Sequence, residues 1–421
     1  MRPFLSRTLS TLICVASLLT ANAADTSTRI FDPAIRSLQL TNPDNFLLPP
    51  IIRLNTNDRI VVTFDEIGYD SRYLRYRLLH CNADWQPSQL VEAEYLDSFN
   101  EAEIDDYAFS SNTFVHFVNY RIELPNERMN PLVSGNYLLQ VYPEGEPDEL
   151  LLQARFQVSE NSVAITGDAS GRSDRGFNTE WQQLEFRVSP GQYRIADPFS
   201  ELKAVISQNS SPTQTRVIER PMRRQGDLLI YEHQPELIFP AGNEYRRFET
   251  VRTNYAGMHV DSMRYVDTHY HAYLTPDEPR RDLPYTFDRT QHGRFKVDEY
   301  NSTDPDIGAD YVTVHFTLRI PELSDADVFV DGEFSGGATD PAFRMKYDHD
   351  ARAYTLQLPL KQGSYNYRYA ARKRTGGALS PDFIEGNHYE TLNTYDISLF
   401  HRTPGARADR LIGTATVEAR P

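Results

Sequence analysis

The chain has 421 residues, and 59 acidic against 43 basic side chains give it a formal net charge of −16 at pH 7. So acidic a protein lacks the positive surface that nucleic acids require, and an anionic membrane would repel it. Its 25 tyrosines and 22 phenylalanines favour β-strands, and its length is sufficient for two to four domains.

The first 23 residues have the pattern of a secretory signal. Two arginines precede an apolar run over 9–19, and small residues end the segment at Ala23. The run is too short for a membrane span, which takes roughly 20 apolar residues. Cleavage after Ala23 removes the two arginines, so the charge becomes −16 minus two, or −18, and it also removes Cys14. Cys81 is then alone and cannot form an intrachain disulfide. We expect an exported protein without a lipid anchor or membrane insertion.

Short segments in which polar and apolar residues alternate run through the rest of the chain. Gly, Pro, Asn or Asp bounds each segment, which is typical of the strands of β-sandwiches. Sustained helical spacing is missing from the sequence, although 92–99 has room for one helical turn. The predicted fold class is all-β, with β-sandwich modules in tandem. The clearest strand segments are 60–64, 73–78, 137–142, 184–188, 311–316 and 365–369.

Breaks in this pattern divide the chain into three predicted sandwiches. A polar linker follows the strand that ends at Val158, two prolines interrupt the chain at 276 and 279, and a new set of strands begins after Asp304. The last two strands, 395–400 and 411–417, either close the third sandwich or extend it along a neighbour. The predicted domains are a signal peptide at 1–23, an N-terminal sandwich at 24–160, a middle sandwich at 161–300 and a C-terminal sandwich at 301–421.

His80 and Cys81 are adjacent, so on a strand they point to opposite faces and cannot share a metal ion or act as a base and nucleophile pair. We interpret them as a hydrogen-bonded histidine and a buried thiol. His269 and His271 lie on one strand face and could supply two zinc ligands, but a third ligand is missing nearby in the sequence.

A second candidate metal site is the acidic run Asp304, Asp306, Gly308 and Asp310. It resembles a calcium loop without the closing glutamate, and an acidic linker is the interpretation that we favour. The sequence holds neither a Gly-x-Ser-x-Gly nucleophile turn nor a His-Glu-x-x-His zinc helix. We therefore predict a protein that is not an enzyme, with no catalytic residue, no metal and no cofactor.

The third module resembles early-set immunoglobulin-like domains, which include starch- and glycogen-binding modules. The resemblance rests on the order of the segments 327–334, 345–348, 354–360 and 361–369. In the sugar-binding members an exposed tryptophan follows the Gly-x-Phe turn. The matching stretch here, 335–340, contains no aromatic residue, so the resemblance supports the fold more than sugar binding.

Over residues 28–415 the chain resembles the type IX secretion system plug proteins of Bacteroidota. Several short motifs occur in the family's order, and the strongest is 80–88, His-Cys-Asn-Ala-Asp-Trp-Gln-Pro-Ser. Further matches include 134–142, 241–246, 361–363 and 385–391. We expect these motifs to have structural or partner-binding roles; their main residues are His80, Cys81, Asn82, Asp84, Trp85, Gly135, Asn136, Gly242, Asn243, Glu244, Lys361, Gln362 and Gly363.

This resemblance implies a periplasmic protein that binds the outer-membrane translocon barrel and closes its periplasmic opening when cargo is absent. It implies a monomer that reaches the outer membrane through its partner and binds no nucleic acid. The alternative, which belongs to a different functional class, is an array of carbohydrate-binding β-sandwiches.

Overall fold

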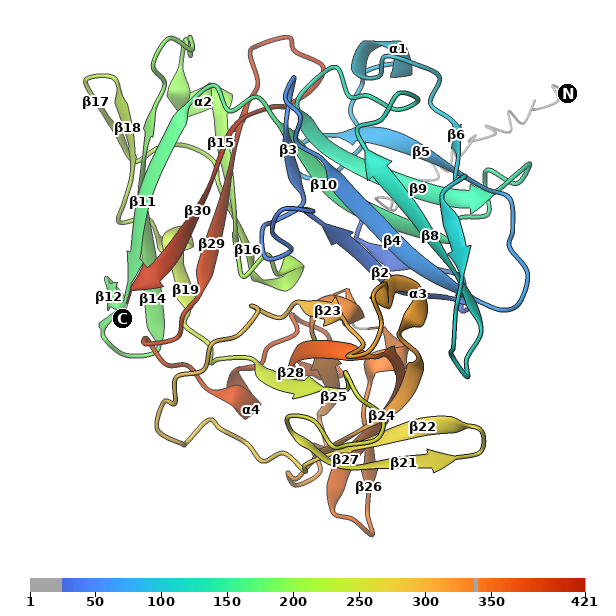
Figure 1. The fold of residues 1–421 in the computed structure, drawn as a ribbon. Helices are drawn as coiled ribbons and strands as arrows, with labels where there is room; N and C mark the ends of the chain where they lie inside the picture. The colour runs from blue at the N-terminus through green and yellow to red at the C-terminus, as the bar shows by residue number, and fades with distance from the viewer. Residues whose placement is uncertain (1–24, 337–339, 421) are drawn as a thin grey trace, which may run out of the picture.

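The computed structural model describes residues 25–336 and 340–420, and it is built almost entirely of β-strands (Figure 1). The predicted all-β fold class is confirmed. The predicted signal peptide, 1–23 with Cys14, lies outside the described residues, as do positions 337–339 of the stretch compared with sugar-binding loops. No helix in the described part of the chain is long and apolar enough to cross a membrane.

The N-terminal sandwich consists of two sheets, one with strand order β1-β10-β9-β5-β6, in which β3 also pairs with β10, and one with order β2-β4-β8-β7. Alternate residues of both sheets point inward and bury one core, in which Phe64 stacks on Tyr120 across the β4–β8 ladder. The expected helical turn is present as α1 (Glu92–Tyr95). The strands are β1 (Arg29–Ile30), β2 (Ile35–Thr41), β3 (Ile51–Arg53), β4 (Ile60–Ile67), β5 (Leu74–Cys81), β6 (Ala102–Glu103), β7 (Tyr107–Phe109), β8 (Phe117–Leu124), β9 (Gly135–Pro143) and β10 (Leu152–Ser159).

The middle sandwich is a nine-stranded sheet of order β16-β15-β29-β30-β11-β14-β18-β17, in which β19 pairs with β14. Its strands bury a second core that contains Phe186, Tyr231 and Ile397. Its elements are β11 (Ala164–Ser170), β14 (Trp181–Ser189), α2 (Pro198–Glu201), β15 (Leu202–Gln208), η1 (Pro212–Gln214), β16 (Thr215–Ile218), β17 (Arg223–Gln225), β18 (Leu228–Tyr231), η2 (Pro235–Leu237), β19 (Ile238–Pro240), β29 (Thr394–His401) and β30 (Arg410–Arg420), with the ribbon β12 (Arg172–Ser173) and β13 (Gly176–Phe177) at one end.

The C-terminal sandwich pairs a sheet of order β20-β28-β23, to which β25 adds through β28, with a sheet of order β21-β22-β24-β27-β26. Phe248, Phe316 and Tyr367 meet edge to face in its core. Its elements are β20 (Arg246–Glu249), β21 (Val260–Val266), β22 (His269–Leu274), β23 (Phe295–Val297), α3 (Pro305–Gly308), β24 (Tyr311–Leu318), β25 (Ala326–Asp331), η3 (Glu333–Ser335), η4 (Pro341–Phe343), β26 (Lys346–Asp348), β27 (Ala353–Lys361), β28 (Gly363–Lys373) and α4 (Asp382–Glu385).

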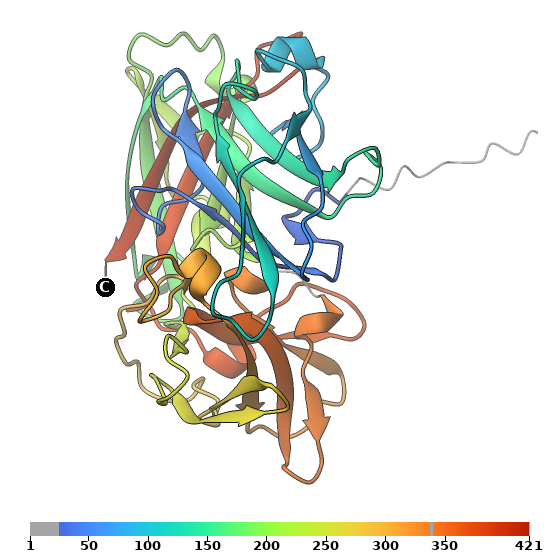
Figure 2. The ribbon, with the colours of Figure 1, turned by 45° about the vertical axis from the view of Figure 1, so that its right-hand side comes forward.

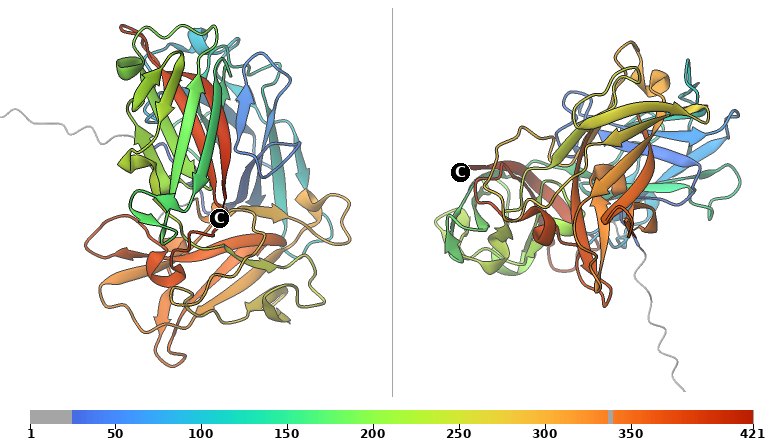
Figure 3. Two further views of the ribbon diagram at one scale, coloured as in Figure 1. Left: turned by 90° about the vertical axis from the view of Figure 1, so that its left-hand side faces the viewer. Right: turned by 90° about the horizontal axis from the view of Figure 1, so that it is seen from below.

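This division differs from the predicted ranges 161–300 and 301–421. The strands between 246 and 297 pair within the C-terminal sandwich, because β20 and β23 both form ladders with β28. The last two strands pair with the middle sandwich instead: β29 forms a seven-residue ladder with β15, and β30 lies beside β11. Figure 3 shows these red strands among the green ones. The last two strands therefore belong to the sheet of the middle sandwich, whereas the predicted ranges place them in the C-terminal sandwich.

The N-terminal and middle sandwiches stand side by side, and the C-terminal sandwich lies beneath both (Figure 2). Each pair of sandwiches is thus in contact, and several of the family-motif residues lie at these three junctions: Asn82, Gly242, Asn243, Glu244 and Lys361.

Candidate functional site

The segment 80–88 begins at the end of β5 and forms a tight turn. The backbone N–H of Asn82 donates to the carbonyl of Gln86 (2.9 Å), and the Asp84 carboxylate accepts from the N–H of Gln86 (3.0 Å). Trp85 adopts a φ of +64°, which is unusual for a bulky side chain and fixes its direction. Its ring lies 4.4 Å from the guanidinium carbon of Arg155 in a cation–π contact.

His80 is buried at the base of this turn. Its Nδ1 lies 2.9 Å from the hydroxyl of Ser88, and its Nε2 lies 3.1 Å from the carbonyl of Ser134. Burial lowers the pKa of His80, so the ring is neutral at neutral pH. A β-carbon on Gly135 would come within 2.3 Å of Nε2, and Gly135 also has a φ of +151°. Both facts require glycine at 135, so the motif residues His80 and Gly135 have a structural role.

Cys81 lies on the opposite face of β5 and is fully buried. Burial raises the pKa of its thiol to about 12, so it carries no thiolate at physiological pH. Asn136 pairs with Cys81 across the β5–β9 ladder, and its side-chain amide donates to the carbonyl of Asn82 (2.7 Å) and accepts from Gln157 (2.8 Å). These residues hold the turn in place and do not form a reactive pair.

The turn joins the N-terminal sandwich to the loop between β29 and β30. The N–H of Ala83 donates to the carboxylate of Asp409 (2.9 Å), and the guanidinium of Arg402 donates to the side-chain oxygen of Asn82 (2.5 Å). Ala83 also packs in a small apolar cluster with Phe400 and Leu411. The strongest family motif therefore forms the junction between the first two sandwiches.

Lys361 joins the C-terminal sandwich to the N-terminal one. Its ammonium group donates to Oδ2 of Asp65 on β4 (2.6 Å) and to the carbonyl of Asp306 (2.6 Å), and it lies 4.1 Å from the ring centre of Phe117. The Asp65 carboxylate also accepts from the hydroxyl of Tyr311 (2.7 Å). A lysine and a carboxylate buried to this degree are tolerated because they pair and their remaining hydrogen bonds are satisfied.

The neighbouring motif residues Gln362 and Gly363 organise the same edge. Gln362 accepts the N–H of Asp310 and donates to the carbonyl of Thr250. A β-carbon on Gly363 would lie 2.1 Å from the carbonyl oxygen of Lys296, so the close approach of β23 requires glycine.

The acidic run 304–310 forms part of this junction. Asp304 caps α3 by accepting the N–H of Asp306 (3.2 Å). Asp310 accepts the backbone N–H groups of Phe114 (2.8 Å) and Val115 (3.0 Å) from the N-terminal sandwich. These carboxylates are directed at backbone donors and not at one common centre.

The third junction contains Gly242, Asn243 and Glu244, between the middle and C-terminal sandwiches. Gly242 has a φ of +65° and its N–H donates to the side chain of Asn387 (2.8 Å), while the Asn243 amide donates to the carbonyl of Glu385 (2.8 Å). The Glu244 carboxylate is buried and accepts from the N–H of Leu392 (2.9 Å). Burial raises the pKa of Glu244.

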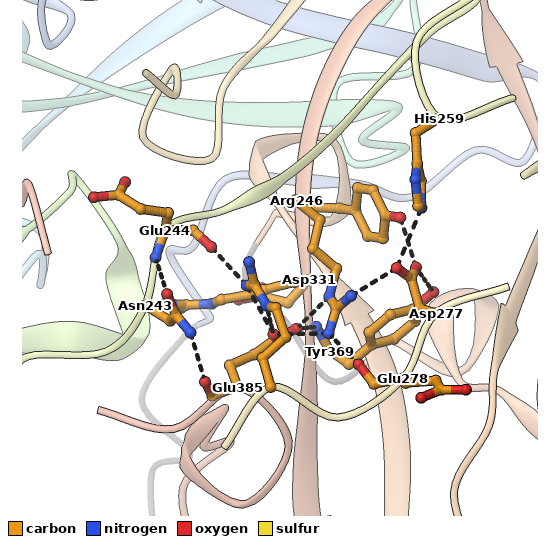
Figure 4. A network of polar contacts seen from close by, with 12 residues as sticks. Asn243, Glu244, Arg246, His259, Asp277, Glu278, Asp331, Tyr369 and Glu385 are labelled. Carbon is orange, nitrogen blue, oxygen red and sulfur yellow. Dashed lines mark hydrogen bonds and ion pairs between the residues drawn. The ribbon is translucent and has the colours of Figure 1, made fainter. Parts of the chain in front are cut away.

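Beside this junction lies the buried ionic network of Figure 4. Arg246 bridges two carboxylates, with Nη1 2.6 Å from Oδ1 of Asp277 and Nε 3.0 Å from Oε1 of Glu385. The hydroxyls of Tyr367 and Tyr369 donate to Oδ2 of Asp277. Burial opposes ionisation of Asp277, but the hydrogen bond of His259 and the charge of Arg246 hold its pKa below the ordinary value. Sequence reasoning placed Arg246 and Glu385 in family motifs without a role, and it missed Asp277.

His269 and His271 gain a third imidazole neighbour in the structure. His315 on the adjacent strand β24 places its Nε2 2.9 Å from Nδ1 of His271. Burial, with repulsion from His271, lowers the pKa of His315 to about 4. Sequence reasoning missed this residue because strand order is not visible in the sequence. Within residues 25–336 and 340–420, no group of three or more His, Cys, Asp or Glu side chains is arranged to hold a metal ion.

Comparisons with known proteins bear on this geometry. A family profile described as type 9 secretion system plug protein 1st domain matches residues 35–160, which is the N-terminal sandwich with its 80–88 turn. A crystal structure of a hypothetical protein from Parabacteroides merdae is 37% identical, covers 93% of this chain and 99% of that chain, and superposes with a TM-score of 0.91.

Other solved structures are much more distant. A DNA glycosylase AlkC from Pseudomonas fluorescens, 14% identical, covers 30% of this chain and 29% of that chain with a TM-score of 0.17. An alpha-2-macroglobulin from Escherichia coli, 8% identical, covers 91% of this chain and 31% of that chain with a TM-score of 0.18. At these TM-scores neither structure indicates a shared fold or function. A comparison with curated proteins found no match. The profile covers the N-terminal sandwich and its strongest motif, and on this evidence the chain belongs to the type 9 secretion system plug protein family.

Proposed function

We propose that this protein is a periplasmic plug, which binds the outer-membrane translocon barrel of the type IX secretion system and closes its periplasmic opening when cargo is absent. Family membership supports a role in type IX secretion. The observation that carries the closing role is the way in which the three sandwiches are joined, because a stopper must keep its shape under load.

Each junction uses buried polar contacts that a relative movement of the sandwiches would break. Separating the N-terminal and C-terminal sandwiches would strip Lys361 from Asp65 and leave both charges without a partner. A charge that loses its partner while it stays buried costs about 3–5 kcal/mol, so small displacements that break the pair without admitting water are opposed more strongly than a typical exposed ion pair would oppose them. Buried pairs at the junctions support a single rigid body, whereas flexible tandem modules are the usual result of small polar interfaces.

We also propose that the protein acts without catalysis and as a monomer. The buried histidines, carboxylates and thiol of the motif residues are used in structural contacts, as His80 and Cys81 illustrate. A plug needs shape and a partner surface, and it has no requirement for a reactive group.

The test is deletion of the gene, with complementation by the intact chain. We expect the deletion strain to admit a large antibiotic that an intact outer membrane excludes, while secretion continues at least in part. We also expect a tagged chain to co-purify the translocon barrel, mainly when secretion is idle, because cargo and plug would compete for one opening. A deletion strain with a normal permeability barrier, together with no barrel in the purified material, would refute the proposal.

The deletion strain and the purified chain also distinguish the plug from the alternative function. An array of carbohydrate-binding sandwiches predicts an unchanged permeability barrier, retention on a polysaccharide resin and poorer growth of the deletion strain on some glycan.

A further inference from the structure

A group of exposed aromatic residues lies where the N-terminal sandwich meets the hairpin of β21 and β22. Phe114, in the loop between β7 and β8, has its ring centre 5.2 Å from that of Tyr265 and 5.7 Å from that of Tyr270. Phe114 and Tyr265 are 53% and 52% exposed. The loop and the hairpin approach each other near α3 (Figure 1). Two sandwiches therefore contribute to one apolar edge.

A cavity of about 450 Å³ adjoins this edge, and we call it the junction pocket. Its wall is fixed by contacts between the sandwiches, since the N–H of Ser111 donates to the carbonyl of Ile307 (2.9 Å) and Asp310 holds the N–H of Phe114. The lining is rich in oxygen atoms and includes no Lys, Arg or His: Ser111, Asn112, Phe114, Thr253, Tyr270, Glu299, Asn301, Ser302, Thr303, Asp304, Ile307, Gly308, Asp310 and Gln362.

Two carboxylates of the junction pocket have no cationic partner among the residues that the structure describes. Glu299 accepts from the backbone and side chain of Asn301, and Asp304 accepts from the N–H of Asp306. In the described part of the chain, no ion pair joins Glu299 or Asp304 to a cationic side chain. Each carboxylate retains free lone pairs, since an ionised carboxylate can accept about four hydrogen bonds. The lining therefore carries negative charge that nothing in its own wall compensates.

These features fit one chemical group. A guanidinium is a weakly hydrated planar cation that donates up to five hydrogen bonds, pairs with carboxylates and stacks on aromatic rings. The junction pocket offers carboxylates, amide and hydroxyl oxygens, and aromatic rings at its rim. The overall charge of −16 would further attract a basic partner. We propose that the junction pocket binds an arginine side chain from a segment of a partner protein, with a neighbouring apolar residue of that segment against Phe114 and Tyr265.

This inference concerns ligand chemistry and does not depend on the plug role, because it can be tested on the purified full chain. The probe is a fluorescein-labelled peptide of sequence Gly-Phe-Arg-Phe-Gly, and the control peptide has citrulline in place of arginine, which keeps the shape and removes the charge. We expect saturable binding of the arginine peptide by fluorescence anisotropy, weakened by salt, and binding at least about tenfold weaker for the citrulline peptide.

Two variants locate the binding. Glu299→Gln with Asp304→Asn removes both charges and preserves shape and capping, and Phe114→Ser removes one exposed ring. Each should weaken the arginine peptide about tenfold with an unchanged melting temperature. The matched control is Glu127→Gln with Asp148→Asn, two exposed acidic residues outside the pocket lining, which should leave binding unchanged.

Three results would overturn the inference. The first is no saturable binding of the arginine peptide, and the second is equal binding of the citrulline peptide. The third is binding that survives the change at Glu299 and Asp304. If a neutral oligosaccharide binds instead and the acidic substitutions have no effect, the junction pocket is a glycan site and the arginine proposal is wrong.

Discussion

The ammonium nitrogen of Lys361 lies 2.6 Å from Oδ2 of Asp65, although the two residues belong to different sandwiches and to distant parts of the chain. Their side chains are 2% and 0% exposed. Replacing Lys361 by Met should destabilise the protein by about 3–5 kcal/mol, because the carboxylate of Asp65 stays buried without its cation. Urea unfolding followed by tryptophan fluorescence measures the loss.

The double variant Asp65→Asn with Lys361→Met separates charge from packing. We expect it to be more stable than Lys361→Met alone, since no buried charge is left without a partner. The exposed pair Arg59 and Glu123 provides the control, and Arg59→Met should cost less than about 1 kcal/mol. Equal effects of Lys361→Met and Arg59→Met would contradict the role that we assign to the buried pair.

Replacing Gly135 by Ala should destabilise the N-terminal sandwich more than the same change at Gly191. Both glycines have positive φ, so an alanine at either position would be strained in its backbone conformation. Only at 135 would the new methyl also meet the His80 ring at 2.3 Å, whereas nothing lies within 4 Å at 191. Differential scanning calorimetry of the two variants makes the comparison. Similar melting temperatures would show that the contact with His80 is not a constraint.

Replacing Cys81 by Ser should cost about 1–3 kcal/mol, because a hydroxyl would be buried without a good partner. Since burial raises the pKa of Cys81 to about 12, a thiol reagent at pH 8 should label the native chain slowly and the urea-unfolded chain quickly. Rapid labelling of the native chain would show that the thiol is accessible. Complete loss of function in the serine variant at unchanged stability would point to a chemical role.

The pKa of His315 predicts a loss of stability in weak acid. The folded value is about 4, lowered by burial and by His271, whereas an unfolded histidine has a pKa of about 6.5. Between these values the unfolded chain binds the extra proton, so stability falls as the pH is lowered from about 6.5 to about 4. The variant His315→Gln should show a flatter dependence of melting temperature on pH in this window. An identical pH profile in both proteins would refute the assignment.

Treatment with a metal chelator should leave the melting temperature unchanged. The carboxylates that resemble a calcium loop are directed at backbone groups, with Asp304 on the N–H of Asp306 and Asp310 on two N–H groups of the N-terminal sandwich. A drop in melting temperature that one specific metal ion reverses would show that a site was overlooked.

Local signals in the sequence were sufficient for the fold class. The alternation over 60–64 and 137–142 predicts strands that bury one face, and these segments lie in β4 and β9. The limits of the sandwiches were predicted less well, because strand partners are chosen by packing over long distances. The strand β29 has the same alternation whether it pairs with a C-terminal neighbour or with β15, about 190 residues earlier.

The candidate site, too, was predictable from the sequence only in part. The family motifs contained His80, Asn82, Gly242 and Lys361, all of which lie at or beside a junction, but their partners could not be predicted from the sequence. Asp65 stands 296 residues from Lys361 and looks like an ordinary polar position in an alternating strand. Such a pair becomes visible only when two sandwiches are placed against each other.

The position of β29 and β30 has a consequence for how the chain is made. These strands lie in the middle of the nine-stranded sheet, between β15 and β11, yet in the sequence they follow the whole of the C-terminal sandwich. During synthesis β15 and β11 expose open edges until these two strands have been made, and open edges invite pairing with other chains. The middle sandwich therefore cannot be completed before the C-terminal sandwich has been synthesised, and a chain that stopped before Thr394 would be left unfinished at the centre of this sheet and open to degradation.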